Sequence, residues 1–422
     1  MSHFGVICPD ATGHLNPMTA LGKELQHRGH QVTIFGRLDS QAKVEVSGLG
    51  FQAIGTTAYP LGATAQMLRT MGSLNGLAAL RYNLNQVAQD VAVRLQDAPS
   101  AIRSVGVDAL LIDQYTPGGG TLAEHLGLPW IDVCNGLPLN REIGIPPSFT
   151  PWTYTPARWS HWRNQAGYRL ADVLARSIRQ VIADKRQQWQ LPSYQRSNDA
   201  YSQLAQLSQI PAELEFPRRE LPAWFHFTGP LTDAASRPAV PFPFEQLTGQ
   251  PIIYASMGTI SNAQIGIFRT IATACVGLNV QLVMSLGGRN PAELPDLPGS
   301  PLVIDYAPQL AILQQATLTI THGGLNTVLE CLANAVPMVV IPLINDQPGV
   351  AARIAWAQAG VILPPNQLSA ARLHTAIAQV LTEETYRKHA SQLQSAIQQA
   401  GGVHRAADIV EQAISTRMPV LR

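Results

Sequence analysis

The chain has 422 residues, of which 46% are hydrophobic, so it is long and apolar enough to form two domains with full cores. Its 29 Lys and Arg residues nearly balance its 28 Asp and Glu residues, and no basic block occurs, which argues against nucleic acid as a partner. The 4 cysteines form no Cys-x-x-Cys pair, so we expect buried free thiols in a reducing compartment and no metal centre.

The amino-terminal residues lack the features of an export signal. Residues 1–8 have neither the basic start nor the long apolar core of a signal peptide. The longest apolar runs, such as residues 338–344, fall far short of the roughly twenty residues that span a bilayer. We therefore expect a cytoplasmic protein that is soluble or at most peripheral to the membrane. Its oligomeric state is not predicted.

The first predicted elements are a strand at residues 4–8, a loop at 10–17, a helix from Met18 and a strand at 32–35. The loop contains Gly13 and His14, just beyond the carboxyl end of the first strand. Open α/β sheets place ligands and catalytic groups at that edge. His14 is therefore a candidate functional residue, although a histidine in a loop is also a common capping or turn residue.

A second candidate follows another strand. Residues 107–113 are typical of a buried strand, with Asp113 at its carboxyl end and a glycine-rich helix start at 118–120. An acid in this position can simply cap the following helix. It can also belong to a site at the same edge of the sheet as His14.

The middle of the chain is less informative. Residues 59–103 and 166–189 are predicted to be largely helical, and residues 137–162 form a proline-rich loop. Four aromatic residues lie in that loop, namely Trp152, Tyr154, Trp159 and Trp162. With Asn135 before them, they could wall an apolar ligand pocket, or the aromatic residues could form a small hydrophobic cluster of their own.

Residues 232–250 are rich in proline and small residues and are interpreted as a linker. A second α/β domain then begins with a strand at 252–256 and a turn that contains Gly258 and Thr259, and further strands are expected at 281–285 and 302–304. The predicted division is an amino-terminal domain at 1–231, a carboxy-terminal domain at 251–395 and a last helix at 396–422 that crosses back to the first domain.

The most specific pattern lies at residues 317–347. A β-branched strand at 317–321 leads into the turn His322-Gly323-Gly324, then a helix from Leu325, and a second strand at 338–341. A glycine turn that opens into a helix exposes unpaired backbone N–H groups at the positive end of the helix dipole, where a phosphate can bind. The alternative is an ordinary βαβ unit with a capped helix.

This order of residues, His-Gly-Gly-x-Asn-Thr followed by Glu, Pro and Asp-Gln, closely resembles the nucleotide-sugar signature of the UDP-dependent glycosyltransferases of family 1. The resemblance implies an α/β GT-B fold, in which two Rossmann-like domains face one another across a cleft. It implies that the diphosphate is held by His322, Gly324, Asn326 and Thr327. It further implies that Glu330 holds the ribose and that Asp346 and Gln347 hold the donor sugar.

The resemblance also suggests roles outside this segment. His14 takes the place of the family's general base, and Asp113 that of the acid that orients it. Tyr306 stands where the family usually has a tryptophan that stacks on the uracil, and offers less stacking area. The complete set of donor-site candidates is Gly13, Ser256, Gly258, Thr259, Tyr306, Ala307, Gln309, His322, Gly323, Gly324, Asn326, Thr327, Glu330, Asp346 and Gln347. The acceptor-site candidates are Asn135, Trp152 and Tyr154.

Over nearly its whole length the chain also resembles the bacterial zeaxanthin glucosyltransferases, chiefly at residues 137–142, 215–219, 225–231 and 346–351. That resemblance implies inverting transfer of a hexose, glucose above all, from a UDP-sugar to a carotenoid. The UDP-sugar is a co-substrate and no cofactor is implied. No Asp-x-Asp occurs, so a metal ion that bridges the diphosphate is not required.

Other readings of the sequence stay open. Sterols, phenols and macrolides are alternative lipophilic acceptors. A GT-B nucleotide-sugar epimerase or a non-catalytic UDP-sugar-binding helper would share the donor signature, although a helper has no need for both His14 and Asp113. No Gly-x-Gly-x-x-Gly follows the first strand, which argues against a nicotinamide dehydrogenase.

Overall fold

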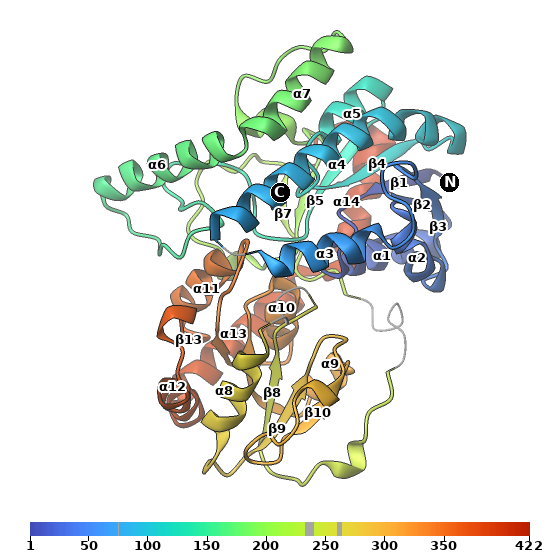
Figure 1. The fold of residues 1–422 in the computed structure, drawn as a ribbon. Helices are drawn as coiled ribbons and strands as arrows, with labels where there is room; N and C mark the ends of the chain where they lie inside the picture. Colours follow the sequence, from blue (N-terminus) through green and yellow to red (C-terminus); the bar gives the residue numbers. More distant parts are fainter. Residues whose placement is uncertain (75, 233–239, 260–263) are drawn as a thin grey trace.

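Two parallel β-sheets, one in each half of the chain, organise the structure, which is a computed structural model that describes residues 1–74, 76–232, 240–259 and 264–422. Figure 1 shows the two halves one above the other, with helices around each sheet. The strands of the first half and those of the second half belong to separate sheets.

The first sheet has seven strands in the order β3-β2-β1-β4-β5-β6-β7, all of them parallel. The strands are β1 (His3–Ile7), β2 (Gln31–Gly36), β3 (Gly50–Ala53), β4 (Ala109–Asp113), β5 (Trp130–Cys134), β6 (Gln206–Ser208) and β7 (Phe225–Phe227). The accompanying helices are α1 (Thr12–His27), α2 (Gln41–Val46), α3 (Ala63–Ser73), α4 (Gly76–Val105), α5 (Gly119–Leu126), α6 (Arg158–Leu174) and α7 (Arg176–Gln188). The central strand β4 is buried along its whole length, as expected of a parallel strand covered on both faces.

The second sheet has six parallel strands in the order β10-β9-β8-β11-β12-β13. They are β8 (Ile252–Ser256), β9 (Gln281–Ser285), β10 (Leu302–Ile304), β11 (Ala316–Thr321), β12 (Met338–Val340) and β13 (Gly360–Ile362). The helices are α8 (Ile265–Cys275), α9 (Gln309–Leu313), α10 (Leu325–Ala333), α11 (Gln347–Trp356), α12 (Ala370–Thr382) and α13 (Glu384–Ala400). Both sheets thus follow the Rossmann strand order, which reverses between β1 and β4 and again between β8 and β11.

The last helix returns to the first domain. α14 (Gly402–Thr416) packs Ala406, Ile409 and Val410 into the core that also contains Leu21 and Leu25 of α1. α13 instead packs into the core beneath α10. The chain changes domain at Gly401 and Gly402, whose φ angles of +88° and +57° suit glycine. In Figure 1 α14 lies within the upper domain, among the amino-terminal strands.

Three expected boundaries differ from the structure. α1 begins at Thr12, so His14 and Pro17 lie in the helix. Pro17 has no N–H for the carbonyl oxygen of Gly13, and this oxygen accepts from Asn326 Nδ2 instead. α6 begins at Arg158 and includes part of the expected 137–162 loop. α13 runs unbroken through the expected boundary at 395. Residues 233–239 of the expected linker lie outside the described residues, and the domain division itself stays a prediction.

Candidate functional site

The predicted site residues lie where each sheet reverses its strand order. In the first domain, α1 with His14 follows β1, and Asp113 ends β4. In the second domain, Ser256 ends β8, and the turn from His322 to Gly324 follows β11. The carboxyl ends of neighbouring parallel strands meet at one edge, so the fold brings each pair together.

His14 and Asp113 are hydrogen-bonded, although 99 residues separate them. His14 Nδ1 lies 2.7 Å from Asp113 Oδ2. The side chain of Asp113 is fully buried, whereas that of His14 is 23% exposed. An ionised carboxylate only accepts hydrogen bonds, so His14 carries its proton on Nδ1 and keeps a lone pair on Nε2. This arrangement suits a histidine that takes a proton at Nε2.

Two more donors hold Asp113 in place. The backbone N–H of Tyr115 donates to Asp113 Oδ1 at 2.8 Å, and Asn135 Nδ2 donates to Oδ2 at 2.6 Å. The ring of Tyr115 also lies beside His14, with ring centroids 5.5 Å apart. The carboxylate is therefore fixed in orientation before any ligand binds.

The surroundings of His14 raise its pKa above the ordinary value. Burial alone would lower the pKa of His14, but the charge of Asp113, its hydrogen bond and the charge of Asp346 together outweigh burial. Burial raises the pKa of Asp346, an effect that the charge of His14 opposes. Although the two residues come from different domains, Asp346 lies close enough to His14 to affect the pKa of the predicted base.

A chain of amides joins the His14–Asp113 pair to the second domain. Gln209 Nε2 donates to Asn135 Oδ1 at 3.1 Å and, more weakly, to Asn326 Oδ1 at 3.5 Å. Asn326 Nδ2 donates to the carbonyl oxygen of Gly13 at 2.7 Å. The residue four positions after Gly13 is Pro17, which has no N–H to donate to that oxygen.

Asn135, which is predicted to belong to the acceptor site, is buried, and its amide donates to Asp113 and accepts from Gln209. Gln209 and Tyr115 were not predicted. Each follows closely on a strand, as Gln209 comes directly after β6 and Tyr115 two residues after β4. That position was the available signal, since the carboxyl ends of the strands converge here.

The expected phosphate turn has the predicted form. Gly323 has a φ of +84°, and Gly324 is the N-cap of α10 and has no side chain to cap its first N–H groups. The imidazole of His322 lies between two glycines, since a Cβ on Gly258 or Gly324 would approach within 2.7 Å or 2.5 Å of its Nε2. Burial lowers the pKa of His322 to about 4, only partly offset by a hydrogen bond to the backbone of Ser256, so this histidine is neutral at pH 7.

The predicted nucleoside residues gather along α10 and α9. Gln309 Nε2 donates to Glu330 Oε2 at 2.6 Å and, at 3.4 Å, to Thr327 Oγ1. The hydroxyl of Tyr254 donates to Gln309 Oε1 at 3.1 Å. Nearby in the sequence, the side chain of Tyr306 is exposed, as a ring that stacks on a base must be.

The other donor-site candidates are placed as follows. Ser256 Oγ accepts from the N–H of Gly258 at 3.3 Å, Thr259 is exposed and Ala307 is buried. Asp346 is the N-cap of α11. Gln347 Oε1 accepts from the N–H groups of Leu343 and Ile344 at 2.8 Å and 2.9 Å, and so shapes the turn that carries Asp346.

The two aromatic acceptor-site candidates pack against different parts of the molecule, Trp152 against α6 and Tyr154 against Phe216 and α11. Trp152 lies against α6, where a Cβ on Gly167 would come within 2.9 Å of its ring. Tyr154 stacks on Phe216 and meets Trp356 edge-on, with centroids 6.1 Å and 5.5 Å away. Trp159 and Trp162 are on α6 and exposed. The four aromatics therefore do not form a single wall.

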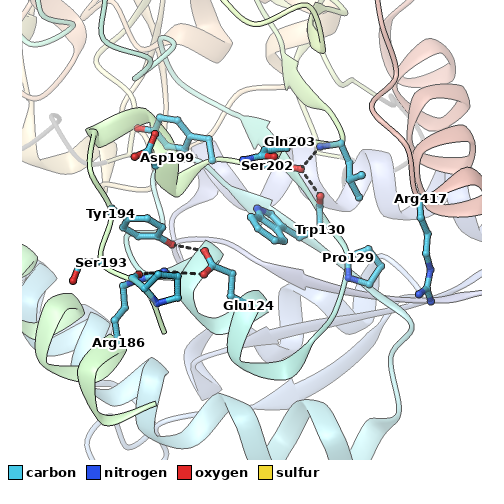
Figure 2. A pocket seen from close by; sticks show the side chains of 13 residues that line it. Glu124, Pro129, Trp130, Arg186, Ser193, Tyr194, Asp199, Ser202, Gln203 and Arg417 are labelled. Atoms are coloured by element: carbon cyan, nitrogen blue, oxygen red, sulfur yellow. Dashed lines mark hydrogen bonds and ion pairs between the residues drawn. The ribbon is translucent and has the colours of Figure 1, made fainter. Parts of the chain in front are cut away.

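A cavity of about 540 Å³ lies elsewhere, beside Trp130 at the amino end of β5. Figure 2 shows Arg186, Glu124 and Tyr194 pointing toward one another at its wall. Arg186 donates to Glu124 Oε2 at 2.8 Å, and the Tyr194 hydroxyl donates to Glu124 Oε1 at 3.0 Å. Because His14 and Asp113 follow the carboxyl ends of the strands, this cavity lies at the opposite edge of the sheet.

Over residues 1–74, 76–232, 240–259 and 264–422, no three His, Cys, Asp or Glu side chains are grouped so that they could hold a metal ion. Within the same ranges, no helix has the length and apolar character to cross a membrane.

The chain is similar to known proteins over nearly its whole length. Residues 6–400 match the family described as UDP-glucoronosyl and UDP-glucosyl transferase. The chain is 35% identical over 424 residues to the zeaxanthin glucosyltransferase of Pantoea ananas, covering 100% of this chain and 98% of that protein. It is also 35% identical over 430 residues to the zeaxanthin glucosyltransferase of Pseudescherichia vulneris, covering 98% of both.

Among solved structures, a calicheamicin glycosyltransferase superposes with a TM-score of 0.76 at 21% identity, covering 99% of this chain and 100% of that one. This likeness confirms the predicted GT-B fold of two Rossmann-like domains. The family match and the full-length relatives confirm the predicted enzyme class. The chain is therefore a member of the UDP-dependent glycosyltransferases of family 1, enzymes that transfer a sugar from a nucleotide-sugar donor to an acceptor.

Proposed function

We propose that this enzyme transfers glucose from UDP-glucose to a hydroxyl group of a carotenoid such as zeaxanthin, with inversion at the anomeric carbon and without a metal ion. The observation that carries the proposal is the His14–Asp113 hydrogen bond of 2.7 Å at the domain boundary. The contact between Asn326 and Gly13 joins that pair directly to the start of α10.

In the proposed reaction His14 Nε2 removes the proton from the acceptor hydroxyl. The oxygen attacks the anomeric carbon as the bond from that carbon to the diphosphate oxygen breaks, and UDP leaves with the electron pair. Asp113 keeps the Nε2 lone pair available and stabilises the imidazolium that forms. Attack from the face opposite the diphosphate in one displacement gives the inverted product.

The donor is proposed to lie along the carboxyl edge of the second sheet. The free N–H groups at the start of α10, with Asn326 and Thr327, take the diphosphate and stabilise its growing charge. Glu330 and Gln309 take the ribose, and Tyr306 stacks on the uracil. Asp346 and Gln347 take the sugar hydroxyls. This charge stabilisation and the lack of an Asp-x-Asp sequence support transfer without a metal ion.

The proposed acceptor rests on the relatives. Two proteins named zeaxanthin glucosyltransferase match along their whole length at 35% identity. Carotenoids are long and apolar with a hydroxyl at the end, so a base that is partly buried and only 23% exposed fits the need to exclude water from the transfer.

The test is mass analysis of the products after incubation with UDP-glucose, detergent-dispersed zeaxanthin and EDTA. We expect zeaxanthin to gain one or two hexose units. Transfer only after Mg²⁺ is restored would rule out the metal-independent step. UDP-glucose turnover with no acceptor, or an isomerised sugar, would favour an epimerase.

A His14→Ala variant tests the base itself. We expect UDP-glucose binding to persist while transfer falls by about 100-fold or more, because proton removal is lost. His404→Ala is the matched control, since this histidine of α14 is 75% exposed and far from the His14–Asp113 pair in the sequence. Transfer by the His14→Ala variant at the wild-type rate would show that the proposed mechanism is wrong.

A further inference from the structure

The large apolar side chains of helix α6 face solvent rather than the core of the domain. Trp159, Trp162, Leu170 and Val173 are 58%, 75%, 54% and 70% exposed. With Ala166 they recur every three or four residues, so they form one stripe, here called the α6 outer face. The opposite side of the helix, buried against the domain, carries Ser160, Asn164 and Gly167.

Hydrogen bonds and close backbone packing hold α6 on the domain. Asn164 Nδ2 donates to the carbonyl of Ile143 at 3.0 Å, and the hydroxyl of Tyr168 donates to the carbonyl of Ile145 at 3.0 Å. Gly167 lets the ring of Trp152 approach closely. The fold therefore makes no use of the α6 outer face. Four large apolar side chains gathered on one exposed helix face mark an interaction surface.

The charges around the α6 outer face have one sign. Helical spacing places Arg158 and Arg169 along one edge and Arg163 along the other, where its guanidinium lies 5.2 Å from the ring of Trp159. Over α6 and α7 there are seven Arg or Lys residues and two Asp residues, in a chain whose net charge is only +1.

Among the described residues, Arg179 pairs with Asp172 and the buried Arg186 pairs with Glu124, whereas the other five of these cations have no acidic partner. One of the two aspartates, Asp172, is already engaged by Arg141 at 2.8 Å and by Arg179 at 3.4 Å. Within the part of the chain that the structure describes, the exposed side chains of Arg158, Arg169 and Arg176 form no ion pair or hydrogen bond.

We propose that the α6 outer face docks on the surface of a bilayer that contains anionic lipids. Tryptophan favours the headgroup region, where its apolar ring and its N–H are both satisfied, and arginine pairs with lipid phosphates. The stripe from Trp159 to Val173 is about 21 Å long, which suits a helix lying in the plane of the interface. The arginines on both edges supply the charge complementarity that selects a lipid surface over an apolar protein groove.

Docking would also bring the site to the membrane. The segment between β5 and α6 begins at Asn135, which holds Asp113, and ends at the α6 outer face. On its way it packs Ser148 against Gly349 of α11 in the second domain. Delivery of a carotenoid along this segment rests on the proposed function, whereas docking itself does not.

The test is co-sedimentation with vesicles of phosphatidylcholine, with and without phosphatidylglycerol. We expect the wild-type protein to sediment with the anionic vesicles only, and its tryptophan fluorescence to shift to the blue. A Trp159→Ser/Trp162→Ser variant should bind these vesicles at least about tenfold more weakly. The matched control is Val46→Ser/Met418→Ser, which removes side chains that are 70% and 65% exposed elsewhere.

A second variant tests the contribution of charge. Arg158→Gln/Arg169→Gln/Arg176→Gln removes three cations and leaves the apolar stripe intact. Binding should fall on the order of 100-fold, and the wild-type affinity should weaken as salt is added. Melting temperatures check that each variant folds. If the tryptophan variant does not fold, the charge variant still tests the proposal. Vesicle binding unchanged in both variants would overturn the proposal. The proposal would also be overturned if the wild-type protein formed a dimer that does not bind vesicles and the tryptophan variant were monomeric. The α6 outer face would then bind a second copy of the chain.

Discussion

Asp113 accepts hydrogen bonds from His14, from Asn135 and from the backbone of Tyr115, and this determines how the proposed base can act. With three donors around one buried carboxylate, the proton of His14 is held on Nδ1 and the ring cannot turn over without breaking a 2.7 Å contact. At the residue scale the chemistry therefore depends on Asp113 as much as on His14.

Asp113→Asn tests this dependence. The pKa of His14 is raised because the charge and hydrogen bond of Asp113, together with the charge of Asp346, outweigh burial, so the acidic limb of the wild-type pH–rate profile should lie above pH 6.5. In the variant burial acts against fewer charges, and the limb should move to lower pH. The maximal rate should fall by about 100-fold or more, because the amide no longer stabilises the imidazolium. Steady-state rates across the pH range measure both effects.

The same variant has a stability signature with a definite sign. A histidine whose pKa is raised on folding stabilises the protein below its unfolded pKa of about 6.5, and that contribution is lost as pH rises through the folded pKa. The cost of Asp113→Asn in urea unfolding should thus be larger at pH 5 than at pH 9. An equal cost at both values would contradict the raised pKa.

At the scale of elements, the strands of the site could be predicted from the sequence. The apolar run at residues 109–113 and the β-branched run at 317–321 both indicate strands, and glycine residues follow their carboxyl ends. The sequence predicts that this helix starts at Met18, because proline favours a helix boundary, whereas α1 starts at Thr12 and Asn326 Nδ2 donates to the Gly13 carbonyl that Pro17 has no N–H to reach. Pairs such as Asn326 with Gly13 are 313 residues apart, and no local pattern reveals them.

Gly324→Ala tests the element that carries the proposed phosphate site. Gly324 has a negative φ of −62°, so alanine fits the backbone, but its Cβ would lie 2.5 Å from His322 Nε2 and displace the ring. UDP should bind at least about tenfold more weakly. Gly266→Ala in α8 is the matched control, since nothing lies within 4 Å of its added Cβ. Calorimetric titration with UDP compares the two, and equal affinities would show that His322 and this turn do not set phosphate binding.

At the scale of the whole molecule, side-chain contacts hold the two domains together in addition to the covalent connections between them. α14 crosses to α1, where Arg28 bonds Glu411 at 2.8 Å. On the other side of the site, Arg353 of α11 bonds Glu215 of the first domain at 2.6 Å, and both side chains are buried. Arg353 also lies over the ring of Phe216, 4.4 Å from its centre. These contacts hold the carboxyl edges of the two sheets against one another.

Glu215→Ala tests this buried link. Removing one member of a buried ion pair leaves the other charge without compensation, so we expect the free energy of unfolding to fall by about 3–5 kcal/mol. The control is Glu293→Ala, which breaks a pair with Arg289 whose side chains are 38% and 31% exposed and which should change stability by about 1 kcal/mol or less. Urea unfolding measures both values. A small cost for Glu215→Ala would mean that this contact contributes little to holding the domains together, and that the alignment of His14 with the proposed donor site depends on the ligand rather than on this contact.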